Sequence, residues 1–487
     1  MLRSMRILVF SCRNSVCRML VGAWLLGLAC FFSGPSLTAA QAGSRAGDMK
    51  SPPAPLYTGE RTSDTRDAHL GLPDAVSMPE AVQRAMKFNP SLSAQESQSR
   101  SSEEGRKSAR GAFGPKLGMS YTAVKREGKN SPASARPPEL GTYSWAVEIS
   151  QPIFQGFKLL ATYQKAALQA DSDKAALRKA GLAMTEQVQT YFLDYLRAEE
   201  NVRSERDSLA RLRDQLRITT AFYDVGLRPR LDVLQAEVNA SQAENLLIQA
   251  ENNRDTYLAM LNTLLGLPAT ARANYTGRLA HVPFRLSLEQ CLETAYRQRP
   301  DLYMAAKSVE IADKDQRVVQ SDYYPQVEAY YNINQTGNTP DLQKSGGRGS
   351  RGSTWEVGAR GTWNVFQWGA TYYADKQAGW LVTKMRYEEE NLKLNVGYDI
   401  KSKLLAVHEA EKRIYMAEKG VEHAAEAYKV ALARYQEQVG TNFDVLDASS
   451  KLTTAQASLT GAKADYLTAL AQIYVAMGEF HPDLMRR

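Results

Sequence analysis

The sequence predicts a mainly α-helical fold with a small transmembrane β part, in which a unit of two strands and one long helical hairpin occurs twice. The first observation is that residues 157–223 contain no proline and that apolar residues recur every seven positions from Val188 to Tyr223, which is typical of a long helix packed against a partner helix. The second is a pair of aromatic-rich runs before that segment, which is typical of β-strands. The third is that both patterns recur 210–212 residues later, which indicates an internal duplication.

Residues 1–42 have the features of a secretory signal peptide. A basic start is followed by an apolar run over residues 19–32, too short to span a membrane, and Ala40-Gln41-Ala42 provides a small-x-small cleavage site. Cys30 follows Leu28 and Ala29, so a lipoprotein with an acylated Cys30 is the alternative form of processing. Residues 43–76 are polar and rich in proline, serine and aspartate, and we expect no packed core there.

Residues 77–268 form the first repeat. Ser77 with Glu80 three positions later predicts the start of a short helix. Strands are expected at 117–124 and 143–153, and a helical hairpin at 157–266 that turns near Gly226, because glycine permits a positive φ. The seven-residue seam consists of Val188, Tyr195, Val202, Leu209, Leu216 and Tyr223.

Residues 287–480 repeat this order after a linker at 269–286, and a short tail at 481–487 follows. Strands are expected at 327–334 and 354–366, and the second hairpin at 369–478. The second half gains two residues between its strand tryptophan and Phe366, and an even insertion preserves which side chains face each side of a sheet. The matching seam consists of Ile400, Val407, Ile414, Val421, Tyr428 and Tyr435.

The four expected strands have the length needed to cross an outer membrane when tilted. Four strands cannot close a barrel, because the smallest barrels have about eight strands and every strand edge in lipid must be paired. Three copies would provide twelve strands. Trp145, Trp355, Trp363 and Trp368 lie in or just beyond these strands, as in the aromatic girdles of membrane barrels. A soluble β-sandwich is the alternative interpretation.

The composition and motifs exclude several classes of function. The net charge is +7, but basic and acidic residues alternate along the expected helices, so we expect no nucleic-acid partner. The sequence contains no HExxH, P-loop or GxSxG motif, and its five histidines are scattered, so we expect no enzyme, no metal site and no cofactor. After signal cleavage Cys291 is the one remaining cysteine, which leaves no intramolecular disulfide.

Several short motifs, found in order and in duplicate, resemble those of the TolC-type outer-membrane efflux and secretion channels. They are Asn89-Pro90-x-Leu92, Gln151-Pro152-Ile153-Phe154-x-Gly156, Phe222-x-x-Val225-Gly226-Leu227 before Asp232-Val233, and Asp444-Val445-Leu446-Asp447-Ala448. The resemblance covers about 77–480. It implies a homotrimer with a twelve-stranded barrel in outer-membrane lipid and an α-helical tunnel across the periplasm. It also implies a periplasmic adaptor (membrane fusion protein) and an inner-membrane transporter as partners.

The resemblance also assigns functional residues at the two hairpin turns. It implies adaptor docking at Val225, Gly226 and Leu227 in the first turn, and at Val439, Gly440 and Thr441 in the second. Asp444 and Asp447 match a pair of carboxylates that constricts the pore, where six like charges would attract cations. The alternative role for these two residues is to cap the N-terminus of a helix.

A hydrogen-bonded latch between the hairpins of such channels maps to Asp232 and Tyr435. The family's remaining latch residue is an arginine in the second turn, where this sequence has Gly440 or Asn442, depending on the alignment. Val439-Gly440 also lies two residues closer to its aspartate than Val225-Gly226 does.

The predicted function is therefore a passive outer-membrane exit duct of a tripartite efflux pump or a type I secretion system. The alternative is a periplasmic coiled-coil adaptor or structural spacer, a class that also has helical hairpins but lacks paired strands with aromatic ends.

Overall fold

The same order of elements occurs twice along the chain. The computed structural model describes residues 75–126, 140–337, 352–481 and 483–484, all within one unit that spans 64–487. The first half contains α2 (Met78–Phe88), α3 (Pro90–Gly111), β1 (Lys116–Arg126), β2 (Leu140–Gln155), α4 (Lys158–Asp224) and α5 (Arg230–Leu264). The second half contains α6 (Leu288–Gln298), α7 (Pro300–Gln320), β3 (Gln326–Gly337), β4 (Gly352–Thr362), α8 (Ala370–Gln436) and α9 (Asn442–Met477).

The predicted fold class is confirmed in this order of elements, including the two long hairpins and the four strands. The expected signal peptide at 1–42, with Cys30, lies outside the described residues. So do 43–74 of the polar segment and most of the tail at 481–487. Val76, the end of that segment, is buried and pairs with Tyr275 of the linker.

The four strands form one antiparallel sheet in the order β1-β2-β3-β4. One cross-strand row contains Met119, Val147, Ile333 and Trp355, and the neighbouring row contains Gly118, Glu148, Asn332 and Glu356. Successive side chains of a strand point to opposite faces. The sheet therefore has one apolar face and one polar face.

The strand boundaries differ from the expected ones mainly at β4. We expected a strand at 354–366, whereas β4 ends at Thr362, which pairs with Gln326 at the start of β3. The residues after Thr362 have no partner strand, because Pro325 precedes β3 and marks the end of its ladder. Trp363 instead donates its indole N–H to the carbonyl oxygen of Tyr323 at 3.2 Å.

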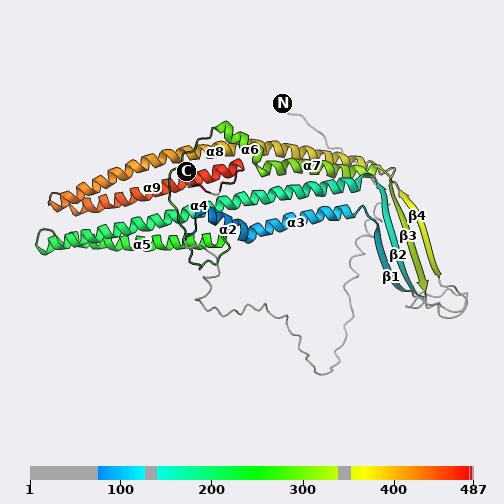
Figure 1. Ribbon diagram of the computed structural model, residues 1–487, viewed down its shortest axis with the longest axis horizontal. Helices are drawn as coiled ribbons and strands as arrows, with labels where there is room; N and C mark the ends of the chain where they lie inside the picture. The colour runs from blue at the N-terminus through cyan, green and yellow to red at the C-terminus, as the bar shows by residue number, and fades with distance from the viewer. Residues whose placement is uncertain (1–74, 127–139, 338–351, 482, 485–487) are drawn as a thin grey trace, which may run out of the picture. The chain divides into compact units, whose positions relative to one another are not determined.

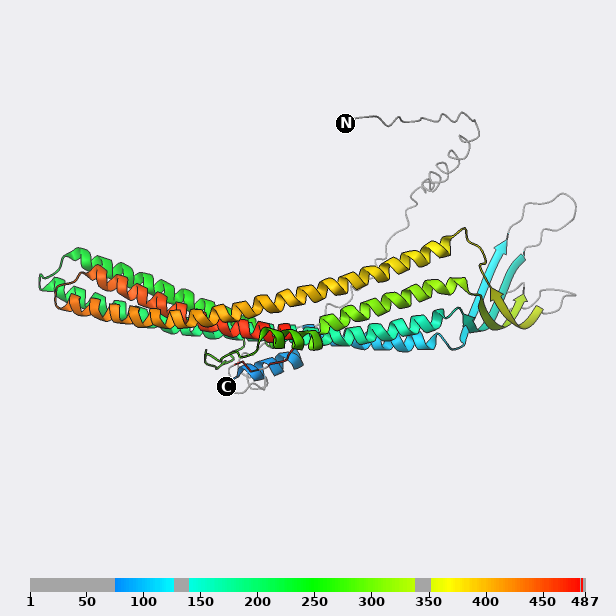
Figure 2. The ribbon, with the colours of Figure 1, turned by 90° about the horizontal axis from the view of Figure 1, so that it is seen from above.

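Four helices lie side by side next to the sheet, in the order α3, α4, α7 and α8 (Figures 1 and 2). Each of them precedes or follows one strand, so the order of these helices repeats the order of the strands. Helix α3 and strand β1 therefore form one edge of the layer, and helix α8 and strand β4 form the other. On the far side, α4 turns back as α5 and α8 turns back as α9, and α9 packs against α4 (Figure 1).

The apolar core lies midway between the sheet and the hairpin turns, where α2, α4, α6, α8, α9 and the linker meet. The seam belongs to this core at Val188 and Tyr195 and, in the second repeat, at Ile400, Val407 and Ile414. Val202 and Leu209, further along α4, are also buried. Cys291 is fully buried in this core, and burial raises the pKa of its thiol. The core therefore holds both repeats together.

On α4 the seam does not remain apolar as far as the turn, whereas Tyr435 and Val445 of the second hairpin stay buried beside theirs. Toward the first turn the buried positions are Gln215 and Thr219, while Leu216 is half-buried and Tyr223 is exposed. A straight helix drifts by about 20° per heptad relative to a strict seven-residue repeat. As the helix continues toward the turn, positions outside the seven-residue repeat, such as Gln215 and Thr219, therefore become the buried ones.

A close joint between helices occurs in both repeats. Asn89 caps α3 by accepting from the backbone N–H of Ser91 (2.8 Å) and donates its side-chain amide to the carbonyl of Leu264 (2.8 Å). Gly266 follows with φ +70°, and a Cβ there would lie 2.7 Å from the carbonyl oxygen of Phe88. In the second repeat Arg299 and Gly478 occupy the corresponding positions, and Gly478 has φ +78°. Only glycine fits this approach without strain.

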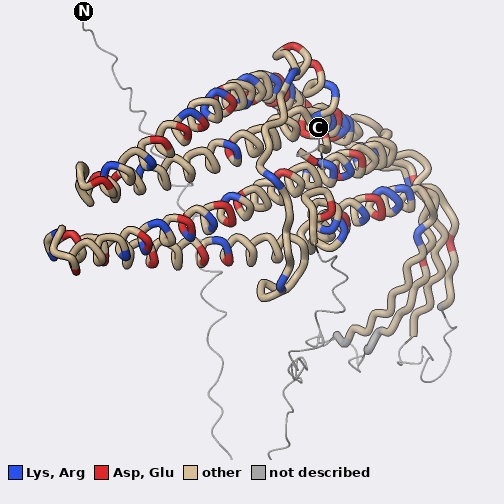
Figure 3. The backbone as a smooth tube through the Cα atoms, turned by 60° about the vertical axis from the view of Figure 1, so that its left-hand side comes forward, with Lys and Arg blue, Asp and Glu red and all other residues tan. Residues whose placement is uncertain are grey.

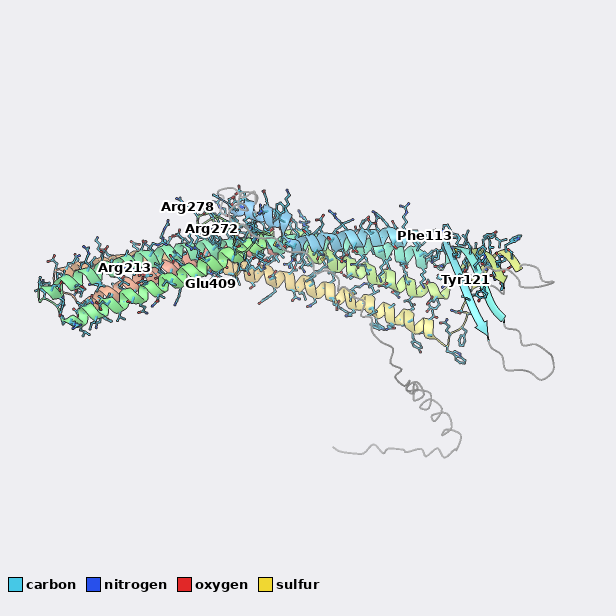
Figure 4. The ribbon with its side chains drawn as sticks, turned by 90° about the horizontal axis from the view of Figure 1, so that it is seen from below. Phe113, Tyr121, Arg213, Arg272, Arg278 and Glu409 are labelled. Atoms are coloured by element: carbon cyan, nitrogen blue, oxygen red, sulfur yellow. The ribbon has the colours of Figure 1, made fainter. Side chains whose placement is uncertain are left out.

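Lysine and arginine alternate with aspartate and glutamate along the hairpins (Figure 3). Many of them form ion pairs within one helix, as Lys451 does with Asp447. Others join the two helices of a hairpin: Arg213 of α4, labelled in Figure 4, pairs with Glu244 of α5 at 3.5 Å. These faces are therefore solvated. Within the described part of the chain, no helix contains an apolar stretch long enough to span a lipid bilayer.

Candidate functional site

The two hairpin turns lie next to each other at the end of the hairpins far from the sheet (Figure 2). In the first turn the backbone N–H of Gly226 bonds to Tyr223 and that of Leu227 to Phe222, at 2.9 and 2.8 Å. Gly226 has φ +77° and open space around it. Val225 and Leu227 are 68% and 51% exposed, so the first turn presents two apolar side chains to solvent.

The second turn is built differently. Its residue with positive φ is Gln438 (φ 63°), which lies 212 residues after Gly226. Val439 and Thr441 are exposed, whereas Gly440 is buried, and a Cβ on Gly440 would lie 3.2 Å from the backbone of Arg434. Val439-Gly440 therefore does not occupy the place of Val225-Gly226, and Gly440 has a packing role in the turn.

Asp444 and Asp447 both have partners within their own helix. Asp444 accepts from the N–H and the hydroxyl of Thr441 at 3.0 and 2.8 Å, while Thr441 caps α9 by accepting from the N–H of Asp444. The bond from the Thr441 backbone lowers the pKa of Asp444. Asp447 pairs with Lys451 at 2.7 Å. The capping role considered for Asp444 is thus observed, and its carboxylate remains at the surface.

Arg228 of the first turn connects the two hairpins. Its guanidinium donates to the carbonyl oxygen of Gly440 at 2.7 Å and lies 5.0 Å from the centre of the Tyr435 ring. Tyr435 is fully buried. A charged donor and a cation over a desolvated aromatic face are both among the stronger polar contacts in proteins.

A chain of hydrogen bonds links the two predicted latch residues, Asp232 and Tyr435, through three other side chains. The carbonyl oxygen of Asp232 accepts from Asn442 (3.0 Å), and Asn442 accepts from Gln215 (2.8 Å). Gln215 also donates to Thr219 (3.3 Å), whose hydroxyl shares a hydrogen bond with that of Tyr435 (3.1 Å). The structure thus brings Asp232 and Tyr435 into one network, in which each contacts a different residue.

Several polar side chains are buried near the turns, beside Tyr435 and Val445. The buried polar residues there include Ser208, Gln215, Thr219, Asn442 and Ser449. Within the described residues, the side-chain oxygens of Gln215 and Ser449 are buried without a hydrogen-bond partner. A buried polar atom without a partner costs about 1–3 kcal/mol, so this part of the interface is less stable than the apolar core.

Sequence reasoning missed Arg228, Gln215 and Thr219, and it named Asn442 only as a position where the family's arginine is replaced. Polar residues on a helix are most often solvated, so only the expectation of a buried seam could have singled out Gln215 and Thr219. The second turn has no arginine at the latch position, and the guanidinium that contacts Gly440 and Tyr435 belongs to Arg228 of the first turn. Among the residues that the structure describes, no group of three or more histidines, cysteines or carboxylates is placed to hold a metal.

The comparisons with known proteins agree on one class. A family model described as outer membrane efflux protein matches residues 81–267 and 291–479. The outer membrane protein TolC of Vibrio cholerae is 26% identical over 409 residues, which cover 83% of this chain and 91% of that protein.

Among solved structures, the fold is similar to the outer membrane protein VceC of Vibrio cholerae, with a TM-score of 0.68, 18% identity, and coverage of 82% of this chain and 96% of that one. It is also similar to the CmeC outer membrane channel of Campylobacter jejuni, with a TM-score of 0.71, 18% identity, and coverage of 91% and 94%.

Proposed function

We propose that this chain, which belongs to the outer membrane efflux protein family and resides in the outer membrane, forms a homotrimeric passive exit duct. In this proposal three sheets close into a twelve-stranded barrel in outer-membrane lipid, and three pairs of hairpins enclose a periplasmic tunnel. The duct serves a tripartite efflux pump or a type I secretion system and performs no catalysis. The observation that carries the proposal is the two-faced sheet with two open edges.

The sheet favours a barrel wall over the alternative of a periplasmic adaptor or spacer. Its apolar face includes Leu117, Met119, Trp355 and Val357, which are all largely exposed, and its other face is polar. Lipid outside and water inside would require this separation. Strands β1 and β4 each pair on one side only within the described chain, and strand edges in lipid must be paired. Pairing β4 of one copy with β1 of the next satisfies both edges.

Helix α8 supports the same assembly. Tyr373, Trp380, Tyr387 and Leu394 recur every seven residues on its surface and are 71%, 72%, 68% and 71% exposed. An exposed apolar seam with this spacing is typical of a helix that packs on a partner. Because α8 and β4 lie at the same edge of the layer, we assign this stripe to contact with the next copy, whose opposite edge is α3 and β1.

The hairpin turns are proposed to dock a periplasmic adaptor that an inner-membrane transporter drives. Val225, Gly226 and Leu227 provide the first docking surface, and Val439 with Thr441 provides the exposed part of the second, beside Gly440. Asp444 and Asp447 are proposed to line the constriction. The network from Asp232 to Tyr435, together with Arg228, is proposed to hold the hairpins closed.

Trimer assembly in the outer membrane tests the proposal. We expect heat-modifiable, trimer-sized migration of the protein from outer-membrane fractions. We expect Trp380→Glu with Leu394→Glu to abolish it, because two charges per copy would be buried in the interface. Arg386→Glu, an exposed position of α8 outside the stripe, is the matched control. Recovery of the wild-type protein as a soluble periplasmic monomer would refute the proposal.

A further inference from the structure

A cavity of about 510 Å³ lies between α2, the start of α3 and α4, beside the end of α9. Its apolar lining is contributed by Met86, Leu92, Leu177, Leu182 and Phe480. This volume falls within the range of about 300–1,000 Å³ that is typical of small-molecule sites, which are mostly apolar with a few polar groups. The cavity is far from the hairpin turns along α4, and none of its lining residues is among those proposed above for docking, constriction or closure.

A glycine in α4 keeps room in this cavity. A Cβ on Gly181 would lie 3.1 Å from the terminal methyl carbon of Met86. Glycine is unfavourable inside a helix, and Gly181 lies in the middle of α4 without a positive φ. Its small size allows α2 to approach α4 and leaves the space beside Met86 open.

Positive charge gathers at the rim of the cavity, on Lys87, Lys174 and Arg178. Lys87 and Arg178 form no ion pair with any carboxylate that the structure describes. Arg178 makes a single marginal bond of 3.4 Å to the carbonyl of Gly478, and Lys87 lies 5.2 Å from the ring centre of Phe88.

The remaining rim charges do not cancel this excess. Lys174 makes only long contacts, of 3.5 and 3.7 Å, with carboxylates. The one carboxylate in the lining, Glu96, is already paired with Arg100. An apolar cavity with two cations that lack anionic partners is complementary to an anion with an apolar tail.

We propose that this cavity binds a single-chain anionic amphiphile. The acyl chain lies along Met86, Leu92, Leu177 and Leu182, and the carboxylate or phosphate head group lies between Lys87 and Arg178. Arg178 forms two parallel hydrogen bonds to either head group, since a guanidinium matches both planar carboxylates and phosphates.

Direct binding to the full-length protein tests this proposal. The protein is held in amphipol without free detergent, and radiolabelled palmitate is titrated by equilibrium dialysis. We expect saturable binding of one palmitate per chain. A molar excess of dodecyl phosphate should displace it if the site accepts both head groups, whereas displacement by laurate but not by dodecyl phosphate would restrict it to carboxylates. Uncharged hexadecanol should bind at least tenfold more weakly.

Two kinds of variant separate the roles of charge and space. Lys87→Gln with Arg178→Gln should weaken palmitate binding at least tenfold and leave hexadecanol binding unchanged. Lys179→Gln, an exposed neighbour on α4 that does not line the cavity, is the matched control and should bind palmitate as the wild type does. Gly181→Leu should abolish binding of both molecules because its side chain fills the cavity.

Three outcomes would overturn the proposal: palmitate binding that does not saturate, equal affinity for hexadecanol, or a charge variant that binds palmitate as well as Lys179→Gln does. Because Gly181→Leu could disturb the packing of α2, the charge variant, which changes only exposed side chains, provides the independent test. Binding is measured on purified protein, so the result does not depend on export.

Discussion

Removal of the Arg228 side chain should favour an open duct. Arg228 makes a charge-assisted hydrogen bond to Gly440 at 2.7 Å and a cation–π contact with buried Tyr435. A hydrogen bond to a charged group contributes about 1.5–3 kcal/mol to stability, and a cation–π contact contributes about 0.5–2 kcal/mol. Because Arg228 is only half-buried, we take the lower part of the combined range, about 2 kcal/mol per copy. Since 1.4 kcal/mol corresponds to a factor of ten, Arg228→Ala should shift each copy toward separated hairpins about 30-fold.

The measurement is the open probability of single channels in planar bilayers. Arg228→Lys keeps the charge but loses the planar group, so we expect an intermediate open probability. Arg230→Ala removes an exposed arginine two positions away, at the start of α5, and serves as the control. The reasoning is refuted if Arg228→Ala leaves the open probability at the wild-type value, or if Arg230→Ala raises it equally.

Three further predictions concern the turns and the helix joint. Asp444→Asn with Asp447→Asn should remove the block of conductance by multivalent cations. Lys451→Gln, which frees the Asp447 carboxylate, should strengthen that block. If neither variant changes the block, these carboxylates do not line the constriction. Gly226→Trp should abolish export with the trimer intact, while Gly226→Ala, which brings the same positive-φ strain without the bulk, should retain export. Gly266→Ala should lower the melting temperature, because its Cβ would lie 2.7 Å from the carbonyl oxygen of Phe88 at φ +70°, which costs at least about 1–2 kcal/mol. Gly461→Ala changes a helical position in open space and should raise the melting temperature.

The pH dependence of the Asp444 cap has a defined sign. Its folded-state pKa is lowered by the bonds from Thr441, so the contribution to stability is present above the ordinary aspartate pKa of about 3.9. It is lost as the pH falls through the lowered folded-state value. Asp444→Asn should therefore lower the melting temperature at neutral pH and have little effect in strong acid.

Much of the fold could be predicted because it follows from periodicity. The seven-residue seam from Val188 to Leu209 is buried, and the duplication at an offset of 212 residues places Gly226 and Gln438 at equivalent positions in their turns. The end of β4 could not be predicted, because the residues after Thr362 have strand composition and lack only a partner. Whether a strand continues depends on its neighbour as well as on its own residues.

The candidate site was less predictable for a related reason. The position of Val225 and Leu227 in the first hairpin turn could be predicted from a local motif. The inter-hairpin contacts depend instead on which residues, more than two hundred positions apart, meet in the folded chain. Arg228 with Gly440, and Gln215 with Asn442, carry no local signal, because an arginine in a turn and a glutamine on a helix are both ordinary. Gly440 and Tyr435 likewise receive their guanidinium contact from Arg228 of the opposite hairpin, which no motif of the second turn indicates.

The change from an apolar to a polar interface determines where the hairpins can part. Separating the apolar core would expose its side chains to water at a free-energy cost of about 25 cal/mol per Å² of apolar surface, and no new hydrogen bonds with water would offset that cost. Separating the layer of Gln215, Thr219, Asn442 and Ser449 breaks hydrogen bonds that water can replace, so the net cost of each is about 1 kcal/mol. Hydration would also satisfy the side-chain oxygens of Gln215 and Ser449, which are buried without partners. Opening should therefore extend from the turns to about Leu209 and end where the apolar seam begins. Within that polar part Arg228 supplies a large share of the holding energy, which is why a single side chain is expected to control it.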